Sequence, residues 1–299
     1  MDVCDNVVAL SERYLAGEGF HVPSPKNIDT KLQLPLTLVR SVPVSPTAAV
    51  FVLQYPQELE EEFRSHVFAH YVLHGRHFEP SVEGYWNGIK SPVEEDNHVA
   101  RKYTPIFVDA DRREVHFLIR IYRCCPDYVD GGRLTRWLEC VDPQGQILLN
   151  PWFTKYSLGK DGFIGPANGE PVEHRTLNIV AGGTGITPFV RFLIHNKKAH
   201  VKLLYCNKTL QEILLKPLID QLRYRGNFEV RYLVTSEDPA VVDSFTPTKD
   251  DNIFFGKLSR KYIEDFFERE DSVTISCGPP GMMMTVKKIT SELGLRTLL

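Results

Sequence analysis

Long apolar runs are absent from the 299-residue sequence: none approaches the roughly 18 consecutive residues that a membrane-spanning helix needs. The first residues, MDVCDNVVAL, carry acids and no basic flank, which is unlike a secretory signal peptide. An excess of positive charge is absent too, since 35 Lys and Arg face 38 Asp and Glu and the net charge is −3. We therefore predict no integral membrane segment and no nucleic-acid partner.

Cysteine is scarce, with six thiols in the whole chain. Their spacing matches neither a zinc clip nor an iron–sulfur motif, and a chain of this length does not need disulfides to hold its core. Free thiols are typical of a reducing compartment, so we predict a cytoplasmic protein. The six are Cys4, Cys124, Cys125, Cys140, Cys206 and Cys277.

Three histidines lie four residues apart, at His66, His70 and His74, a spacing that on a helix would suggest a metal site. The run HVFAHYVL that starts at His66 is rich in β-branched and aromatic residues and predicts a strand instead. The histidines would share a strand face, but Phe68 and Val72 lie between them and no carboxylate or cysteine accompanies them. We therefore predict no bound metal.

The first half of the chain is dominated by segments typical of strands. Residues 1–33 are predicted to form an N-terminal extension with a short helix near Val7–Leu15. A long stretch rich in glycine, proline and acids predicts a loop over 75–100, and GGRLTRWLEC predicts a short helix. The runs predicted as strands are 34–42, 48–55, 66–73, 114–122 and 146–150.

After about Pro171 the pattern changes to strands that alternate with helical stretches, which predicts a parallel sheet with helices on both faces. The strands expected here are Leu177–Ala181, Val201–Cys206, Phe228–Val234 and Val273–Cys277. The sequence therefore predicts a two-domain protein of class β + α/β, with domains at 34–171 and 172–299 after the extension at 1–33.

Two glycine-rich segments follow strands in the second half. In AGGTGITP we expect Thr187 as the N-cap and Pro188 as the first helical residue, with free N–H groups that suit an anion. In SCGPPGM, Cys277 is expected at a strand tip, where open α/β sheets bind ligands. A plain strand-to-helix turn and a small buried cysteine remain the alternatives.

The first half supplies arginines beside tyrosines. In the extended segment ARKYTP, Arg101 and Tyr103 share a face, and they suit a phosphate and a flat ring. In VHFLIRIY one face is expected in the core and the other, which carries Leu118, Arg120 and Tyr122, could bind a ligand or be solvated. The segment GGRLT adds a second candidate anion site. Together these features suggest a flavin site beside a dinucleotide site.

Four ordered motifs carry a resemblance to a known family: RKYTP at 101–105, GGRLT at 131–135, GGTGITP at 182–188 and CGPPGM at 277–282. The chain resembles the ferredoxin–NADP reductase superfamily, NADH–cytochrome b5 reductase branch, from about Leu34 to Met284. The resemblance implies an antiparallel Greek-key FAD-binding barrel followed by a Rossmann-like parallel α/β NAD-binding domain, with the flavin edge at the interface.

The resemblance also implies roles by position. Arg101 would hold the FAD pyrophosphate, Tyr103 would pack on the isoalloxazine, and Thr104 would hydrogen-bond its reactive nitrogen. Thr104 and Cys277 are thereby the expected catalytic residues. The other residues implied near the flavin and its phosphates are Leu118, Arg120, Tyr122, Gly132, Arg133, Leu134, Thr135 and Thr187. Those implied to line the nicotinamide dinucleotide cleft, with Cys277, are Gly183, Thr184, Gly278, Pro279 and Met282.

The choice between NADH and NADPH is expected to rest on an acid after the strand FEVRYLV. Glu237 in TSEDPA fits best as the acceptor for the ribose hydroxyls, and Asp238 is its rival. A carboxylate there would repel a 2′-phosphate, so NADH is the predicted cofactor. A solvated loop acid is the alternative.

The predicted activity is an FAD-dependent NADH reductase that passes electrons singly to a small haem protein such as cytochrome b5. The alternatives are a flavin reductase for a quinone, a ferric chelate or an oxygenase component, and a diverged non-catalytic interaction protein. Three departures from the family pattern keep these open: LLNPWFTKYSLGKDGF replaces the usual G-P-x-G turn, the loop over 75–100 is longer than the pattern needs, and the acidic NGEPVEHRT stands where some members are basic.

Overall fold

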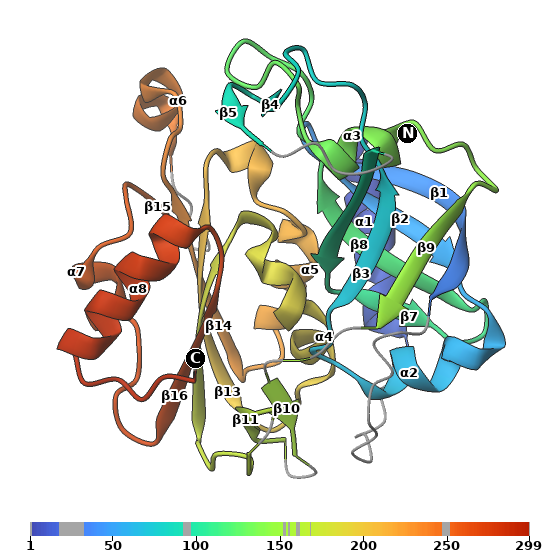
Figure 1. Ribbon diagram of the computed structural model, residues 1–299. Helices are drawn as coiled ribbons and strands as arrows, with labels where there is room; N and C mark the ends of the chain where they lie inside the picture. Colours follow the sequence, from blue (N-terminus) through green and yellow to red (C-terminus); the bar gives the residue numbers. More distant parts are fainter. Residues whose placement is uncertain are drawn as a thin grey trace. The chain divides into compact units, whose positions relative to one another are not determined.

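The computed structural model describes residues 2–17, 33–91, 97–151, 154, 156–159, 162–167, 169–246 and 252–298. Its contacts divide the chain into two compact units (Figure 1). One comprises residues 23–154, and the other comprises residues 155–299 together with 1–22. None of the helices in the described residues is long and apolar enough to cross a membrane.

The unit of residues 23–154, here the β unit, is built on one antiparallel, barrel-like sheet of seven strands in the order β6-β3-β9-β1-β2-β8-β7 (Figure 1). Every neighbouring pair in it is antiparallel. The short helix predicted from GGRLTRWLEC is present as α3, Arg133–Glu139. The strands are β1 Leu34–Ser45, β2 Ala48–Gln54, β3 Tyr71–Arg76, β6 His98–Tyr103, β7 Phe107–Asp109, β8 Glu114–Arg120 and β9 Gln146–Pro151.

The core of the β unit confirms the expected inward face of the segment EVHFLIRIY. Val115, Phe117 and Ile119 of β8 lie in one buried apolar cluster together with Phe51 of β2. The alternative that the opposite face of β8 is solvated is wrong at Leu118, which is only 2% exposed. A strand that is buried on both faces does not alternate between apolar and polar residues, so the periodicity of the sequence alone could not show that its second face is buried.

The strand predicted over 66–73 is wrong at its first half. Residues Glu60–Ser65 form helix α2, preceded by the turn η1 Gln57–Leu59, and the strand β3 begins only at Tyr71. Buried Leu59 and Phe63 are spaced four apart, which is the helical period that the strand prediction overlooked.

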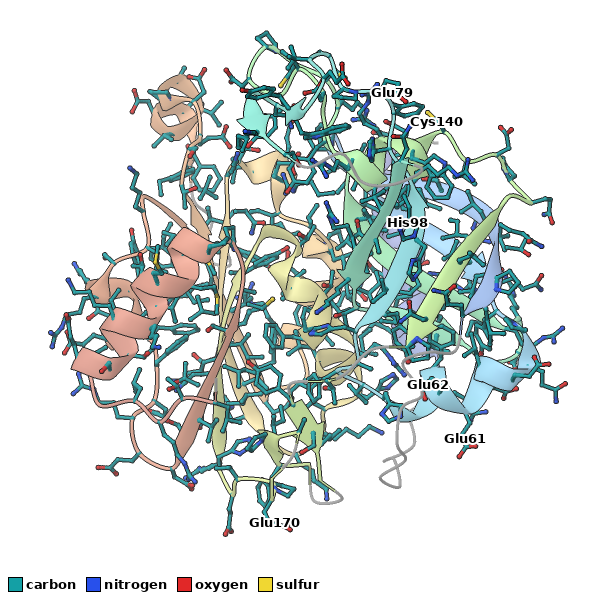
Figure 2. All side chains as sticks on the ribbon, viewed as in Figure 1. Glu61, Glu62, Glu79, His98, Cys140 and Glu170 are labelled. Atoms are coloured by element: carbon teal, nitrogen blue, oxygen red, sulfur yellow. The ribbon has the colours of Figure 1, made fainter. Side chains whose placement is uncertain are left out.

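The three histidines therefore have separate partners, with only His74 in a strand. His66 faces Glu62 of α2 at 3.5 Å, and His74 Nδ1 lies 3.0 Å from His98 Nε2. Glu61 and Glu62 lie at the opposite end of the β unit from Glu79 (Figure 2). Within the described residues, no group of three or more His, Cys, Asp or Glu side chains is placed to hold a metal ion.

The long loop predicted over 75–100 contains a small hairpin, of strands β4 Tyr85–Trp86 and β5 Ile89–Lys90. Its turn residues Asn87 and Gly88 have φ angles of 50° and 75°, as a two-residue type I′ turn requires. We call residues 81–91 the inserted hairpin. Residues 92–96 of the predicted loop lie outside the described part of the chain.

The inserted hairpin is tied to the segment before α3 through Asp130. The two carboxylate oxygens of Asp130 accept the backbone N–H groups of Ser81 at 2.6 Å and Asn87 at 2.5 Å. The side chain of Asn87 returns two bonds, accepting from the Asp130 N–H at 2.8 Å and donating to the Gly131 carbonyl at 3.0 Å. Four hydrogen bonds therefore hold a loop that has little apolar burial of its own.

The other unit, here the α/β unit, contains a five-stranded sheet in the order β15-β14-β13-β12-β16, with all neighbours parallel. All four strands predicted in this half are confirmed, and β15 was not predicted. The strands are β12 Thr176–Gly182, β13 His200–Asn207, β14 Phe228–Val234, β15 Ile253–Phe255 and β16 Ser272–Cys277. A separate antiparallel hairpin consists of β10 Tyr156–Leu158 and β11 Ile164–Pro166.

Helices cover both faces of this parallel sheet, as expected (Figure 1). Helices α7 and α8 bury Ile263 and Val286 in one apolar cluster with Val180 and Leu204 of the sheet. Helix α1, Val3–Ala16, packs against α5 in the same unit, and its range extends the short helix predicted near Val7–Leu15. The other helices are α4 Thr187–His195, α5 Lys216–Arg223, α6 Pro239–Ser244, α7 Arg260–Glu264 and α8 Pro280–Glu292, with the short turns η3 Gly183–Ile186 and η4 Leu210–Glu212.

We predict that Asp130→Ala lowers the free energy of unfolding by about 2 kcal/mol, because the backbone N–H groups of Ser81 and Asn87 lose a charged acceptor. Burial alone would raise the pKa of Asp130, but the N–H groups of Ser81 and Asn87 and the nearby Arg136 guanidinium outweigh it and lower this pKa. The stabilisation is therefore full at neutral pH and is lost only in acid, below about pH 4, as the folded carboxylate is protonated.

Urea unfolding and hydrogen exchange at the amides of residues 81 and 87 measure this effect. Asp127→Ala, which removes an exposed carboxylate from the same loop, is the matched control and should leave stability unchanged. Equal unfolding free energies for the two variants at pH 7 would show that Asp130 does not hold the hairpin.

Candidate active site

The two glycine-rich segments of the α/β unit begin at neighbouring strand ends. Strands β12 and β16 are parallel neighbours, and Ala181 is paired with Cys277. GGTGITP and CGPPGM therefore leave the sheet side by side at its carboxyl edge. The expectation that both motifs face one ligand-binding edge is compatible with this register.

The glycines in these motifs allow the two tips to touch. A Cβ on Gly185 would come within 2.2 Å of the Cys277 carbonyl oxygen and 2.9 Å of the Gly278 Cα. A Cβ on Gly182 would lie 2.7 Å from Met282 Sδ. Backbone atoms cannot give way as a side-chain end can, so Gly185 is a packing requirement between the two tips.

The helix start after GGTGITP differs from the prediction. Residues Gly183–Ile186 form the turn η3, Ile186 is the N-cap of α4, and Thr187 is already the first helical residue. No side chain caps this helix, so the expected N-cap role of Thr187 is wrong. The turn η3 continues directly into α4. Within this turn, Gly183 adopts a left-handed φ of 53°.

Cys277 is half-buried at the end of β16, next to a residue that the sequence analysis missed. Burial raises the pKa of Tyr156 to about 12, and the neighbouring Cys277 thiol adds to that rise. Tyr156 begins β10, in the hairpin of β10 and β11. A lone tyrosine in an irregular segment gives no signal in sequence, because its contact with Cys277 spans more than a hundred residues.

Glu237 joins two loops at the carboxyl edge of the sheet. One carboxylate oxygen accepts the Leu210 N–H at 2.7 Å, and the other accepts the Asp238 N–H at 3.2 Å. Asp238 instead caps α6 by accepting the Ala240 N–H at 2.8 Å. Of the two rival acids, Glu237 is therefore the one held between the segments that follow β13 and β14.

In the β unit, three of the expected ligand-binding residues form one group. Burial raises the pKa of Tyr103, the Arg101 guanidinium opposes that rise, and Tyr122 adds to it, so these side chains lie within electrostatic reach of one another. Arg101 is exposed. The ring of Tyr122 is 48% exposed and lies 6.3 Å from the ring of Tyr128, which is 49% exposed.

An exposed arginine beside uncovered tyrosine rings is a surface suited to a flat aromatic ligand that carries phosphate. At its base, the Thr104 side chain is 4% exposed, and its hydroxyl lies 2.8 Å from His70 Nδ1. From its spacing in the sequence, His70 was considered only as a metal ligand, and its contact with Thr104 was not predicted. Strand pairing of Tyr71 with Tyr103 places the two segments together, and no local pattern predicts that.

The remaining expected residue of β8, Arg120, donates from Nη1 to Thr47 Oγ1 at 3.1 Å.

The GGRLT segment is folded tightly around the backbone of Tyr122. The Gly132 N–H donates to the Tyr122 carbonyl at 2.7 Å, and the Tyr122 N–H donates to Thr135 Oγ1 at 3.3 Å. A Cβ on Gly132 would lie 2.2 Å from that hydroxyl oxygen. Leu134 is buried beside them. Gly132, Leu134 and Thr135 thus shape the segment, and they hold it against the exposed Tyr122 ring.

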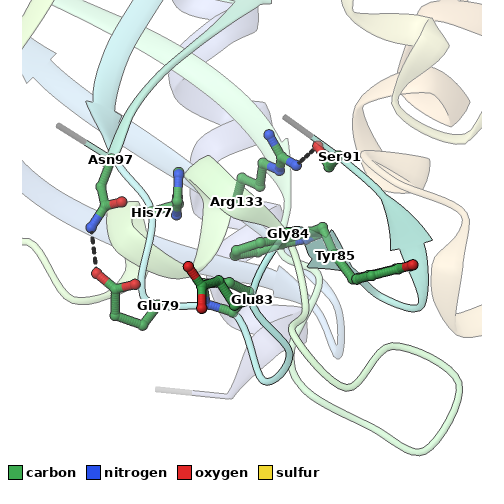
Figure 3. Close-up of a pocket in the computed structure, with 10 residues that line it drawn as sticks. His77, Glu79, Glu83, Gly84, Tyr85, Ser91, Asn97 and Arg133 are labelled. Carbon is green, nitrogen blue, oxygen red and sulfur yellow. Dashed lines mark hydrogen bonds between the residues drawn. The ribbon is translucent and has the colours of Figure 1, made fainter. Parts of the chain in front are cut away.

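Arg133 is the member of this segment that extends outward. Its guanidinium donates to Ser91 Oγ and lies 5.0 Å from the centre of the Trp86 ring, both in the inserted hairpin (Figure 3). The family resemblance implied that Arg133 lies at a phosphate, and the stacking of Trp86 on its guanidinium was not predicted.

Comparison with known proteins finds several similar reductases. Residues 179–288 match the family model described as the oxidoreductase NAD-binding domain. The chain is 28% identical over 203 residues to NADH-cytochrome b5 reductase 2 of Mus musculus, covering 62% of this chain and 69% of that protein. It is 34% identical over 218 residues to the plasma membrane-associated coenzyme Q6 reductase of Saccharomyces cerevisiae, covering 71% of this chain and 61% of that protein.

Among solved structures, the cytochrome b5 reductase domain of Ulva prolifera nitrate reductase superimposes with a TM-score of 0.69. The superposition covers 90% of this chain and 98% of that domain, at 19% identity. A likeness at this identity supports the two-domain fold, with an antiparallel barrel-like part and a parallel α/β part.

We predict that Gly185→Ala lowers the free energy of unfolding by about 1–3 kcal/mol, because its methyl group must displace the Cys277 carbonyl and separate the two strand tips. Urea unfolding measures the change. Gly281→Ala is the matched control: a Cβ there meets no atom within 4 Å, and alanine favours the helix that contains it. Equal stability of the two variants would mean that the tips can separate freely.

Proposed function

Because the chain belongs to the ferredoxin–NADP reductase superfamily and is NADH–cytochrome b5 reductase-like within it, we propose that it is an FAD-dependent enzyme that oxidises NADH and reduces a small haem protein such as cytochrome b5. The observation that carries this proposal is the pairing of Ala181 with Cys277, which unites the two glycine-rich motifs at one sheet edge.

The β unit fits a flavin. Bound FAD supplies the ability to take two electrons as a hydride and release them one at a time. Tyr103 and Tyr122 offer ring surface to the isoalloxazine, and Arg101 offers its guanidinium to the pyrophosphate. Gly132 has no Cβ, which would otherwise collide with the Thr135 hydroxyl, so the GGRLT segment can lie close to Tyr122. Thr104 is held at the base of this surface by His70, so its hydroxyl keeps one orientation.

The α/β unit fits the nicotinamide nucleotide. Its residues bind and orient NADH, and they exclude water. Cys277 is half-buried at the tip of β16, within electrostatic reach of the buried Tyr156, and a nicotinamide ring there would lie against its polarisable sulfur. The further residues proposed to line the nucleotide site are Gly183, Thr184, Gly278, Pro279 and Met282.

The reaction needs no general acid or base on this chain. NADH loses a hydride and becomes NAD⁺, two acceptor molecules take one electron each, and one proton is released to solvent. This balance explains why the site is built from glycine, aromatic and sulfur groups.

A second acceptor, a quinone, is favoured by one observation: the relative with 34% identity is a coenzyme Q6 reductase. The acidic run NGEPVEHRT and the net charge of −3 also provide little attraction for an acidic haem protein.

Location in the cytoplasm stays a prediction, supported by six cysteines that are all free of disulfides.

The test is to reduce the purified yellow protein with NADH under anaerobic conditions and then to reoxidise it with single acceptors. We expect NADH to bleach the flavin absorbance and cytochrome b5 to restore it, with two molecules of cytochrome reduced per NADH. A soluble ubiquinone analogue should act at least about tenfold more slowly. Faster reoxidation by the quinone would select the second acceptor, and the absence of bound flavin would contradict the proposed function.

We predict that Glu237→Ser narrows the preference for NADH over NADPH by about tenfold, because a carboxylate repels a 2′-phosphate. The ratio of kcat/KM values for the two nucleotides measures this preference. Asp243→Ser removes an exposed acid from the following helix α6 and is the matched control. If both variants keep the wild-type ratio, Glu237 does not set the nucleotide preference, and its role is the hydrogen bond that joins the two loops through Leu210.

A further inference from the structure

Three consecutive methionines, Met282, Met283 and Met284, lie in the first turns of α8. Successive residues of a helix point about 100° apart, so neighbouring thioethers meet different surroundings. Met284 is 70% exposed, whereas Met282 is half-buried and packs against the apolar cluster that contains Val180 and Leu204. The resemblance implies that Met282 lines the nucleotide cleft, and it assigns no chemistry to the sulfur.

The end of the Met282 side chain fills the space that two glycines leave open. A Cβ on Gly182 would lie 2.7 Å from Met282 Sδ and 3.0 Å from its Cε, and a Cβ on Gly278 would collide with the same Cε. Gly182 and Gly278 directly follow Ala181 and Cys277, the last residues paired between β12 and β16. The thioether therefore lies against both strand tips, at the sheet edge proposed to bind the nucleotide.

Methionine sulfur undergoes a two-electron oxidation to the sulfoxide. With hydrogen peroxide as oxidant, the O–O bond breaks, an S–O bond forms, the sulfur loses two electrons and the rest of the peroxide leaves as water. The sulfoxide is polar and has one more heavy atom than the thioether. At Met282 the new oxygen would press on the strand tips, bring a polar atom against the apolar cluster, or enter the nucleotide cleft. Each of these positions opposes the packing or the binding at this edge.

Cys277 is a second oxidisable group at the same edge, and it is half-buried as well. The two sulfurs differ in what reduces them again. A sulfenic acid or disulfide of cysteine is reduced by a small dithiol, whereas methionine sulfoxide requires the methionine sulfoxide reductases, one for each epimer. The chemistry of recovery therefore identifies which sulfur was oxidised.

We propose that Met282 is a site of reversible oxidation by hydroperoxides, and that its sulfoxide weakens binding of the nicotinamide nucleotide. The inference rests on the proposed function, because the loss falls on NADH, and it adds a modification that controls the nucleotide edge. In the reverse step the sulfoxide takes two electrons from two thiols, which become a disulfide, and the oxygen leaves as water.

The experiment treats the purified flavin-bound protein with hydrogen peroxide and then with dithiothreitol, so that reversible cysteine oxidation is removed. Peptide mass spectrometry gives the sulfoxide fraction at Met282 and at Met284 separately. We expect Met284 to be oxidised first without effect, and the KM for NADH and the Kd for NAD⁺ to rise about tenfold as Met282 is oxidised. The amount of bound flavin should stay constant, and the two sulfoxide reductases together should restore both values.

Two variants separate Met282 from its neighbours. Met282→Leu has a similar volume and no sulfur, so its own KM for NADH and Kd for NAD⁺ should not change on peroxide treatment. Met284→Leu removes the exposed methionine of the same helix and is the matched control, which should keep the full sensitivity of the wild type.

Bound nucleotide should also protect the site. Saturating NAD⁺ should slow the oxidation of Met282 at least about fivefold, because a ligand in the cleft covers the residues that line it. The oxidation of Met284 should proceed at the same rate with and without NAD⁺. This measurement uses mass spectrometry alone and does not depend on activity.

Three results would overturn the inference: Met282 stays reduced while Met284 is oxidised, Met282→Leu loses as much NADH affinity on peroxide treatment as the wild type, or the sulfoxide reductases fail to restore the KM. In each case the untreated protein would still show bleaching of its flavin by NADH, and the proposed function would stand. Flavin that NADH does not reduce in the untreated protein would instead overturn the proposed function and this inference together.

Discussion

The close approach of two strand tips is the constraint on which the candidate nucleotide site depends. Parallel pairing brings Ala181 level with Cys277, and the backbone after each strand must then turn away within a few residues. A Cβ at position 185 would lie 2.2 Å from the Cys277 carbonyl oxygen, so glycine is the residue that fits there without displacing backbone. The motif glycines therefore serve sheet packing first, and the ligand-facing edge is a consequence of that packing.

A different principle organises the β unit, where exposed aromatic and cationic groups are held in place by buried polar contacts. Thr104 is oriented by His70, Gly132 is bonded to the Tyr122 carbonyl, and Asp130 anchors the inserted hairpin. Each contact fixes a backbone segment close to Tyr103 or Arg133. The surface that remains open is thus rigid, which favours a large planar cofactor over a flexible ligand.

Sequence reasoning succeeded where local pattern and tertiary environment agree. Strands β12 and β16 of the α/β unit are buried over most of their length on both faces, and their apolar runs are visible in the sequence. It failed at 66–73, where the helical spacing of Leu59 and Phe63 lay just outside the segment considered. It also overlooked Asn87-Gly88, a dipeptide that strongly predicts a type I′ hairpin even within a loop-like composition.

The sequence by itself determined the order of the two folds, the four motifs and the residue types that a flavin and a nucleotide need, because these depend on local spacing and on backbone freedom. Only the tertiary structure decided which residues support them: Tyr156 beside Cys277, His70 on Thr104, Trp86 on Arg133 and Glu237 on Leu210. These partners lie from 27 to more than 100 positions apart in the chain. Contacts over such separations arise from strand pairing and loop packing, which leave no periodic trace in the sequence.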